Sequence, residues 1–135
     1  MAERIESHVT VLYETPQTQE LERLVRATPP LLLRAGTIGR WTSEPGIFVA
    51  VLDPVDHLRR FRVAALGVHD PGYVPHITLL HRESVMSTKQ AEEAWAALRG
   101  VTFDGDFVVT QLVVYEEVGT GWHEAARPRF GMDAV

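Results

Sequence analysis

The chain has 135 residues, a formal net charge of −5 and no cysteine. This length suits one domain with a substantial hydrophobic core, and an apolar fraction of 45% is ordinary for a globular protein. The absence of cysteine excludes a disulfide framework and thiolate chemistry. The negative charge argues against a broad, sequence-independent grip on long nucleic acid, but leaves a small anionic ligand open.

No run of residues approaches the length of a membrane span, so we expect no membrane partner. The N-terminus, Met1 to Ile5, is charged, leads almost directly into the first predicted strand and lacks the pattern of a signal peptide. We therefore expect a single domain over residues 1–135, located in the cytoplasm. Its oligomeric state stays open.

The first part of the chain alternates strand and helix signals. The Thr15-Pro16 pair predicts a helix start, and a proline pair stops that helix. The apolar residues inside it are spaced as one helix face: Leu21, Leu24 and Val25. The predicted elements are a strand, a helix, an extended stretch and a buried strand: 5–13, 15–28, 31–41 and 47–52.

A second helix is expected to open at Asp53-Pro54 and to end at Gly67. Its inward-facing residues are predicted to be Val55, Leu58, Phe61 and Ala65, and its solvent-facing residues Arg59, Arg60 and Arg62. A capping box predicts a third helix whose inner face holds Ala91, Ala94, Trp95 and Leu98. Strands are predicted over 75–80, 101–103 and 107–115, and the residues from 116 onward receive no assignment.

One pattern occurs twice, a histidine and a threonine two residues apart among apolar neighbours: His8-Val9-Thr10-Val11 and Pro75-His76-Ile77-Thr78-Leu79. In a strand, residues i and i+2 point to the same face, so each strand presents one titratable ring beside one hydroxyl. Two such copies arise by chance in on the order of one chain in two hundred of this composition. A half-buried strand histidine explains either copy alone, but the pair favours a functional site.

Residues 5–52 and 75–117 repeat the same order of elements, followed by a tail over 118–135. No long sequence identity links the two halves, so the repeat is architectural. Two such units around an approximate two-fold axis would bring the two His-Thr pairs face to face. We therefore predict a bilobal α+β fold in which two mostly antiparallel sheets line a central groove and helices cover the outside.

Two opposed His-Thr pairs suit phosphodiester cleavage without a metal or cofactor. Free histidine titrates at about pH 6.5, so at neutral pH one ring can remove a proton while the other donates one. Threonine hydroxyls can donate to the non-bridging oxygens of a phosphate and stabilise charge that develops there. The catalytic candidates are His8, Thr10, His76 and Thr78.

Two other kinds of site have weaker support in the sequence. A zinc site usually adds a third protein ligand, and both motif strands carry threonine where that ligand would stand. A serine nucleophile often lies in a Gly-x-Ser-x-Gly elbow, which the chain lacks. We therefore expect no metal ligands.

The two motifs resemble those of the 2H phosphoesterase superfamily, which includes the 2′-5′ RNA ligase-like proteins. Residues 38–41 followed by 47–51 are also similar to the family's middle hairpin, and the resemblance covers roughly residues 5–117. It implies the bilobal fold and metal-independent cleavage of 2′- or 3′-linked phosphodiesters, with ligase-like activity also known in the family. Catalytic roles carry over to the four motif residues only. His81 stands where many relatives have arginine, which leaves the substrate open.

Four further residues are candidates for substrate binding. Arg40 and Arg82 border the strands and could neutralise phosphate, although a solvated surface charge is the common alternative. Tyr115 and Trp122 lie at or after the last predicted strand, where an aromatic ring could stack on a base. The remaining tryptophans and histidines receive structural assignments: Trp41 and Trp95 in the core, and His57, His69 and His123 on the surface.

Two classes of function are consistent with these observations. The first is a phosphodiesterase acting on a nucleotide, a cyclic nucleotide or an RNA end. The second is a nucleotide-binding module that keeps the groove without turnover. The intact motif residues favour the enzyme. Within the family, some phage members hydrolyse cyclic di- or trinucleotide signals of antiviral defence, and the compact, acidic chain makes this the alternative substrate class.

Overall fold

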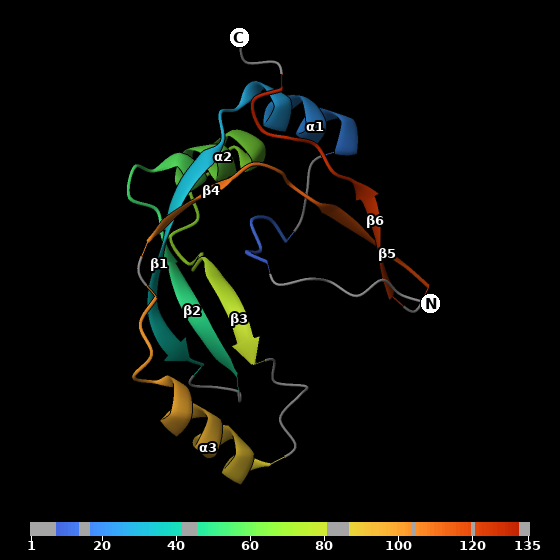
Figure 1. Cartoon of the computed structure of the whole chain (residues 1–135). Helices are drawn as coiled ribbons and strands as arrows, with labels where there is room; N and C mark the ends of the chain where they lie inside the picture. Colours follow the sequence, from blue (N-terminus) through green and yellow to red (C-terminus); the bar gives the residue numbers. More distant parts are fainter. Residues whose placement is uncertain are drawn as a thin grey trace.

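The structure is a computed structural model that describes residues 8–13, 17–41, 46–80, 87–103, 105–119 and 121–132. Helices and antiparallel strands mix along the chain, as Figure 1 shows, which confirms the predicted α+β class. The elements are α1 Thr18–Ala27, β1 Leu31–Arg40, β2 Ile47–Leu52, α2 His57–Leu66, β3 His76–Leu80, α3 Thr88–Leu98, β4 Asp106–Val109, β5 Val114–Val118 and β6 Gly121–Ala126. Within the described part of the chain, no helix is long and apolar enough to cross a membrane.

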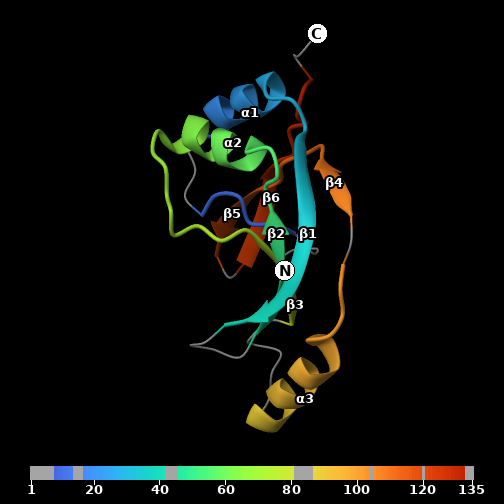
Figure 2. The same cartoon turned by 90° about the vertical axis from the view of Figure 1, so that its left-hand side faces the viewer.

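An antiparallel four-stranded sheet forms the centre of the fold, in the order β3-β2-β1-β4 (Figure 1). The long, curved β1 carries two partners in succession, β4 on its first residues and β2 from Arg34 onward (Figure 2). Its pairing with β2 slips between Ala35 and Ile38, where a bulge bends the strand. The sheet thus combines two strands from before α2 with two strands from after it, and β5 and β6 form a separate hairpin.

The hydrophobic core lies between one face of this sheet and the paired helices α1 and α2 (Figure 2). Leu21 and Val25 are buried, as their spacing in α1 predicts, and Leu58 and Phe61 are buried from α2. Phe61 meets the ring of Phe130 edge to face, with centroids 5.3 Å apart. Burying a side chain of this size stabilises the fold by roughly 1.5–3 kcal/mol, so this cluster fixes how the helices dock.

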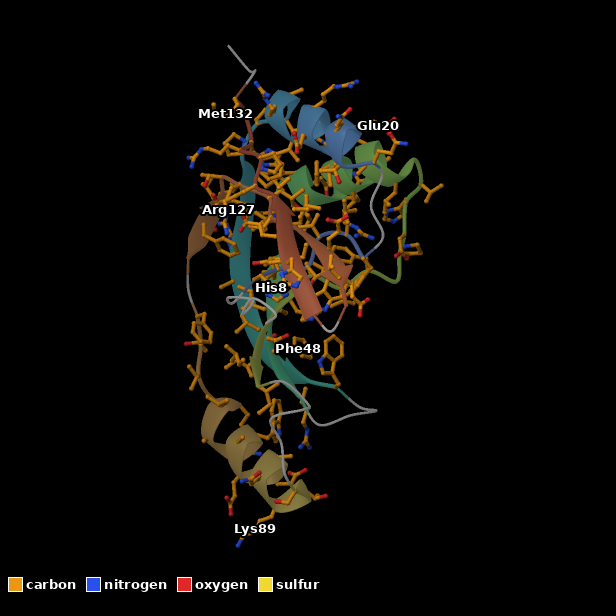
Figure 3. The ribbon with its side chains drawn as sticks, turned by 90° about the vertical axis from the view of Figure 1, so that its right-hand side faces the viewer. His8, Glu20, Phe48, Lys89, Arg127 and Met132 are labelled. Carbon is orange, nitrogen blue, oxygen red and sulfur yellow. The ribbon has the colours of Figure 1, made fainter. Side chains whose placement is uncertain are left out.

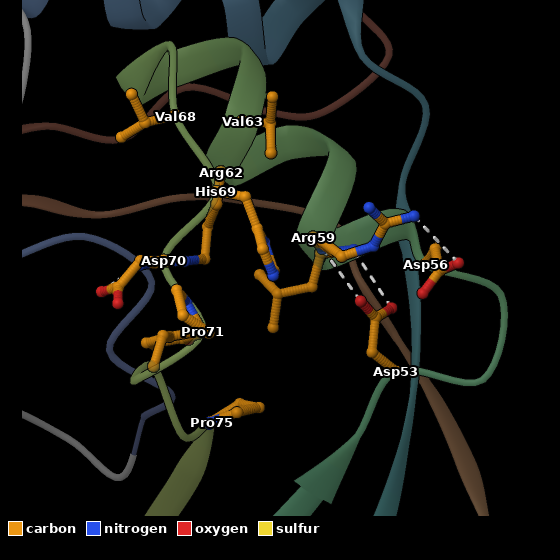
Figure 4. A pocket seen from close by; sticks show the side chains of 12 residues that line it. Asp53, Asp56, Arg59, Arg62, Val63, Val68, His69, Asp70, Pro71 and Pro75 are labelled. Atoms are coloured by element: carbon orange, nitrogen blue, oxygen red, sulfur yellow. Dashed lines mark hydrogen bonds and ion pairs between the residues drawn. The ribbon is translucent and has the colours of Figure 1, made fainter.

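The start of α2 differs from the sequence prediction. Residues 53–56 form a turn, Asp56 has a positive φ of 60°, and the helix begins only at His57. Asp53 nevertheless caps it, because its two carboxylate oxygens accept hydrogen bonds from the amides of Leu58 and Arg59, at 3.1 and 2.9 Å (Figure 4). The aspartate therefore satisfies exposed amides of the first turn from farther upstream than an ordinary N-cap.

Helix α3 lies at the opposite end of the sheet from α1 and α2 (Figures 1 and 2). The predicted cap is present, since Ser87 accepts a hydrogen bond from the amide of Gln90. The helix has no buried residue, so the prediction of Trp95 as a core residue is wrong: its ring is half-buried, with the Arg40 guanidinium 4.9 Å from its centroid.

The C-terminal part is more finely divided than its apolar sequence suggested. Residues 101–103 form no strand, and the predicted strand over 107–115 is two strands, β4 and β5, that belong to different sheets. After β6 the chain returns to the core: the amides of Leu112 and Phe130 donate to the carbonyls of Pro128 and Thr110. The tail, to which the sequence assigned no structure, therefore supplies β6 and the buried Phe130.

Candidate active site

A single β-bridge joins the two His-x-Thr motifs. Val9 and Ile77 are antiparallel bridge partners, and both pack against the hydrophobic core. The residues on either side of this pair are those of the motifs, His8 and Thr10 in one segment and His76 and Thr78 in the other. Strand alternation, which β3 provides for His76 and Thr78, predicts that all four lie on the opposite face. Continued along both segments, the register of this bridge predicts that His8 stands across from Thr78 and Thr10 across from His76.

This face is open to solvent at His8, which is exposed, while the other three motif residues are half-buried. Figure 3 views the molecule from the side of His8 and shows it near the middle, between the hairpin and the lower part of the sheet where Phe48 is labelled. The sequence predicted two His-Thr pairs facing each other from two sheets. In the structure, Val9 of the first motif bridges to Ile77 on β3, an edge strand of the four-stranded sheet.

The ring of His76 is held from two sides. Its Nδ1 lies 2.9 Å from the carbonyl oxygen of Val74. A carbonyl can only accept, so Nδ1 carries a proton and donates it, which leaves Nε2 as the free position of the neutral ring. Trp41 and Phe48 contact the same ring edge to face, with centroids 5.0 and 5.7 Å away.

Gly39 makes room for this arrangement. It is the register partner of Phe48, and a Cβ at Gly39 would lie only 2.7 Å from Phe48 Cζ. The absent side chain lets the Phe48 ring lie across the β1 backbone and stack on Trp41 at 4.3 Å. Trp41 is half-buried, and its prediction as a core residue missed this contact with a motif histidine.

The first motif is held by side chains from the second helix and the following loop. Arg62 donates to the carbonyl of Val11, and the hydroxyl of Tyr73 donates to the carbonyl of Thr10 at 2.6 Å. The prediction that Arg62 faces solvent is wrong, because only 7% of it is exposed. Burial raises the pKa of Tyr73 from 10.0 to about 12, which keeps its hydroxyl protonated as a donor at ordinary pH.

Of the two candidate arginines, the structure describes only Arg40. Arg40 forms an ion pair with Glu92 at 2.9 Å and lies over Trp95, so its contacts are with α3. Arg34 is paired with Asp106 at 2.6 Å, and this hydrogen bond lowers the pKa of the carboxyl. Arg82 lies outside the described residues.

The candidate aromatic residues lie on the hairpin. Tyr115 is half-buried on β5, and Trp122 is exposed on β6. Their register partners are Glu124 and Glu117, which puts both rings on the same face of the hairpin. The hairpin and the first motif contribute to the same hydrophobic core, since Val114 of β5 and Val11 belong to one buried cluster.

Of the three histidines predicted to lie on the surface, one is exposed and two are half-buried. His69 is exposed, as predicted. His57 is half-buried, and its Nδ1 accepts a hydrogen bond from the backbone amide of Leu32 at 3.0 Å. His123 is half-buried on β6 opposite Glu116. His57 is therefore a structural contact between α2 and β1, and nothing in its sequence neighbourhood signals this.

A cavity of about 350 Å³ lies between α2 and the loop that precedes β3 (Figure 4). Its walls include Arg59, Arg62 and Tyr73, but none of the four motif residues. Over the residues with a described position, no group of three or more histidine, aspartate or glutamate side chains could hold a metal ion. The site as described thus offers imidazole rings and hydroxyls for proton transfer and hydrogen bonding.

Known proteins that this chain resembles indicate its family and its fold. A family model described as the 2′-5′ RNA ligase superfamily matches residues 1–121. Among solved structures, the protein TT0787 of Thermus thermophilus is similar over 93% of this chain and 78% of its own, with a TM-score of 0.57 and 21% identity. No curated protein matches. The structural likeness concerns the fold alone, and it confirms the predicted α+β architecture.

Proposed function

Because the chain belongs to the 2′-5′ RNA ligase superfamily, within the 2H phosphoesterases, we propose that it is a metal-independent phosphodiesterase. It cleaves 2′- or 3′-linked phosphodiester bonds of a nucleotide, a cyclic nucleotide or an RNA end. The observation that carries the proposal is the antiparallel bridge between Val9 and Ile77, the residues that stand between the histidine and the threonine of each motif.

The proposed reaction uses the two histidines on opposite sides of the phosphorus atom. One ring removes a proton from water as the water oxygen attacks phosphorus. The other ring protonates the leaving ribose oxygen as its bond to phosphorus breaks. Hydrolysis of a cyclic phosphate thus gives one phosphate monoester and one free hydroxyl, and the protons balance. The hydrogen bond from His76 Nδ1 to Val74 supports Nε2 as the nitrogen that exchanges the proton.

The two threonines have a different proposed role. Thr10 and Thr78 are half-buried beside the histidines, and each hydroxyl can donate to a non-bridging phosphate oxygen. Donors that the fold holds in place need little rearrangement as negative charge builds up on that oxygen. Removal of one such donor typically lowers kcat by about 10²–10³-fold, so Thr10→Val and Thr78→Val should be impaired while still folded.

The test measures product formation from a panel of nucleotides in excess chelator. The panel holds 2′,3′-cyclic mononucleotides, a 2′-5′-linked dinucleotide, and cyclic di- and trinucleotides. Wild type is compared with His8→Ala and His76→Ala, and His69→Ala is the matched control because His69 is exposed on the loop before β3. We expect turnover by wild type and the control, and loss of at least about a hundredfold in each motif variant.

Each result has a distinct meaning. Cleavage of cyclic mononucleotides or of the 2′-5′ linkage supports the proposal for nucleotide or RNA-end substrates. Cleavage of the cyclic di- or trinucleotides alone, lost in the variants, would assign the substrate to the signal nucleotides. Saturable binding without turnover of any substrate would contradict the enzyme and support a nucleotide-binding module. Full activity in either alanine variant would also refute the mechanism.

A further inference from the structure

The first motif has little support from the sheet itself. Within residues 8–13 only Val9 forms a β-bridge, and the residues on both sides of it are assigned to no strand. A single bridge restrains the rotation and sliding of this segment against β3 only weakly. Strand register is normally fixed by a ladder of successive residue pairs. Contacts from outside the sheet therefore help to determine where Thr10 lies relative to the second motif.

Arg62 and Tyr73 supply that contact through two adjacent backbone carbonyls. Arg62 Nη1 donates to the carbonyl of Val11, and the Tyr73 hydroxyl donates to the carbonyl of Thr10 at 2.6 Å. The two side chains also stack, with the guanidinium carbon 3.5 Å from the centre of the tyrosine ring. Asp70 completes the group, 3.5 Å from Arg62 Nη2.

Arg62 is buried, and a buried guanidinium depends on contacts such as those of this group. Keeping a guanidinium this far from solvent is expensive unless each side of its planar fork meets a partner. Here a carbonyl, a carboxylate and an aromatic face are the partners. The arginine thereby joins three segments of the chain: α2, the first motif and the loop before β3.

Tyr73 is close in sequence to the second motif, so its hydrogen bond to Thr10 links the two motifs. It lies three residues before His76, whose Nδ1 is bonded to the carbonyl of Val74. The next carbonyl, that of Pro75, accepts from the amide of Val51 in β2 at 3.0 Å. The backbone between Tyr73 and His76 is therefore fixed, and the bond from Tyr73 to Thr10 fixes the first motif against it.

We propose that Arg62 and Tyr73 are positioning residues, which hold the first His-x-Thr motif in register with the second so that both histidines reach one phosphate. This inference rests on the proposed phosphodiesterase function. Neither side chain is placed in contact with substrate, and both act on the motif backbone. Their effect should appear in the alignment of the acid and the base, and substrate binding should change little.

The test compares Tyr73→Phe, which removes one hydroxyl and keeps the ring under Arg62, with Tyr13→Phe, since Tyr13 is 75% exposed. We expect kcat to fall about tenfold in Tyr73→Phe with KM within twofold, because a small misplacement of a catalytic group acts on the chemical step. The pH–rate profile should change shape, since one proton-transfer group has moved. Arg62→Lys should show a larger loss, and Arg60→Lys, on the exposed part of α2, should not.

A lower fraction of folded enzyme would reduce kcat too, but would scale the whole pH profile without altering its limbs. That result, or a Tyr73→Phe variant indistinguishable from Tyr13→Phe, overturns the positioning role. Amide hydrogen exchange tests the same role without measuring turnover. The amides of residues 8–13 should exchange about tenfold faster in Tyr73→Phe, while the exchange rates of the α1 amides should not change. If wild type turns over no substrate, the proposed function fails, and the exchange arm still decides whether Tyr73 holds the first motif.

Discussion

Replacing Gly39 by alanine tests how the second motif histidine is supported. The new Cβ would lie 2.7 Å from Phe48 Cζ and 3.0 Å from Phe48 Cε2, whereas carbon atoms in contact sit at about 3.5–4.0 Å. The Phe48 ring must therefore move by about 1 Å. That movement disturbs its stack on Trp41, at 4.3 Å, and its edge contact with His76, at 5.7 Å.

The expected loss of stability follows from these aromatic contacts. An aromatic pair contributes about 0.5–1.5 kcal/mol beyond the area it buries, so Gly39→Ala should lower the free energy of unfolding by about 1 kcal/mol. For a chain of this length this is a fall in Tm of roughly 3 °C. Displacing the support of His76 should also lower kcat by about tenfold, because a 1 Å error at a reacting group is costly.

The assay combines urea unfolding with turnover of the best substrate. Gly100→Ala is the control, because a Cβ at Gly100 meets nothing within 4 Å. Phe48→Leu supplies a second background: without the ring, Gly39→Ala should lose most of its cost, a coupling of about 1 kcal/mol. If Gly39→Ala behaves like Gly100→Ala, or if it lowers the free energy of unfolding equally in both backgrounds, Phe48 does not couple Gly39 to His76.

Three further outcomes follow from other contacts. Asp53→Ala should lower the free energy of unfolding by about 1 kcal/mol through loss of the α2 cap, measured against Glu93→Ala, which removes only an exposed pair with Lys89 and should change it less. His57→Ala should cost about 1–3 kcal/mol in urea unfolding, because it leaves the part-buried amide of Leu32 without its acceptor; a cost near zero would show that water replaces the ring. The folded chain raises the pKa of Tyr73 from 10.0 to about 12, so its neutral form stabilises the fold fully below pH 10, and this contribution is lost between pH 10 and 12. Tyr73→Phe should lose less stability across that window than wild type, and an equal loss would contradict the burial.

Several elements with a short-range signal were predicted well from the sequence, but the strand predicted over 5–13 is wrong within the described residues 8–13, where only Val9 forms a β-bridge. The spacing of Leu21 and Val25 placed α1, and the runs of apolar residues placed β1 and β2. The strand predicted over 107–115 was wrong for a long-range reason. Its first residues pair with β1 and its last with β6, so the chain must break between two sheets, and only the identity of the partner strands determines where.

Arg62 was predicted to face solvent because of its residue type, but it is buried. It stands one residue after Phe61 and four after Leu58, so it is in phase with the buried face of α2. That spacing was an available signal, but an arginine there is normally solvated, and its partner Val11 is distant in sequence. The paired motifs, by contrast, were recognisable locally, because the histidine and the threonine stand two residues apart in each of them.

The pH–rate profile in excess chelator shows whether two histidines divide the acid and base roles. Wild type should give a bell-shaped dependence of kcat/KM on pH, from one group that must be deprotonated and one that must be protonated. His8→Ala and His76→Ala should each retain only a trace of activity, and each trace should lack a different limb of the bell. A wild-type profile without two limbs, activity abolished by chelator, or either variant keeping the full bell at a high rate would contradict the account.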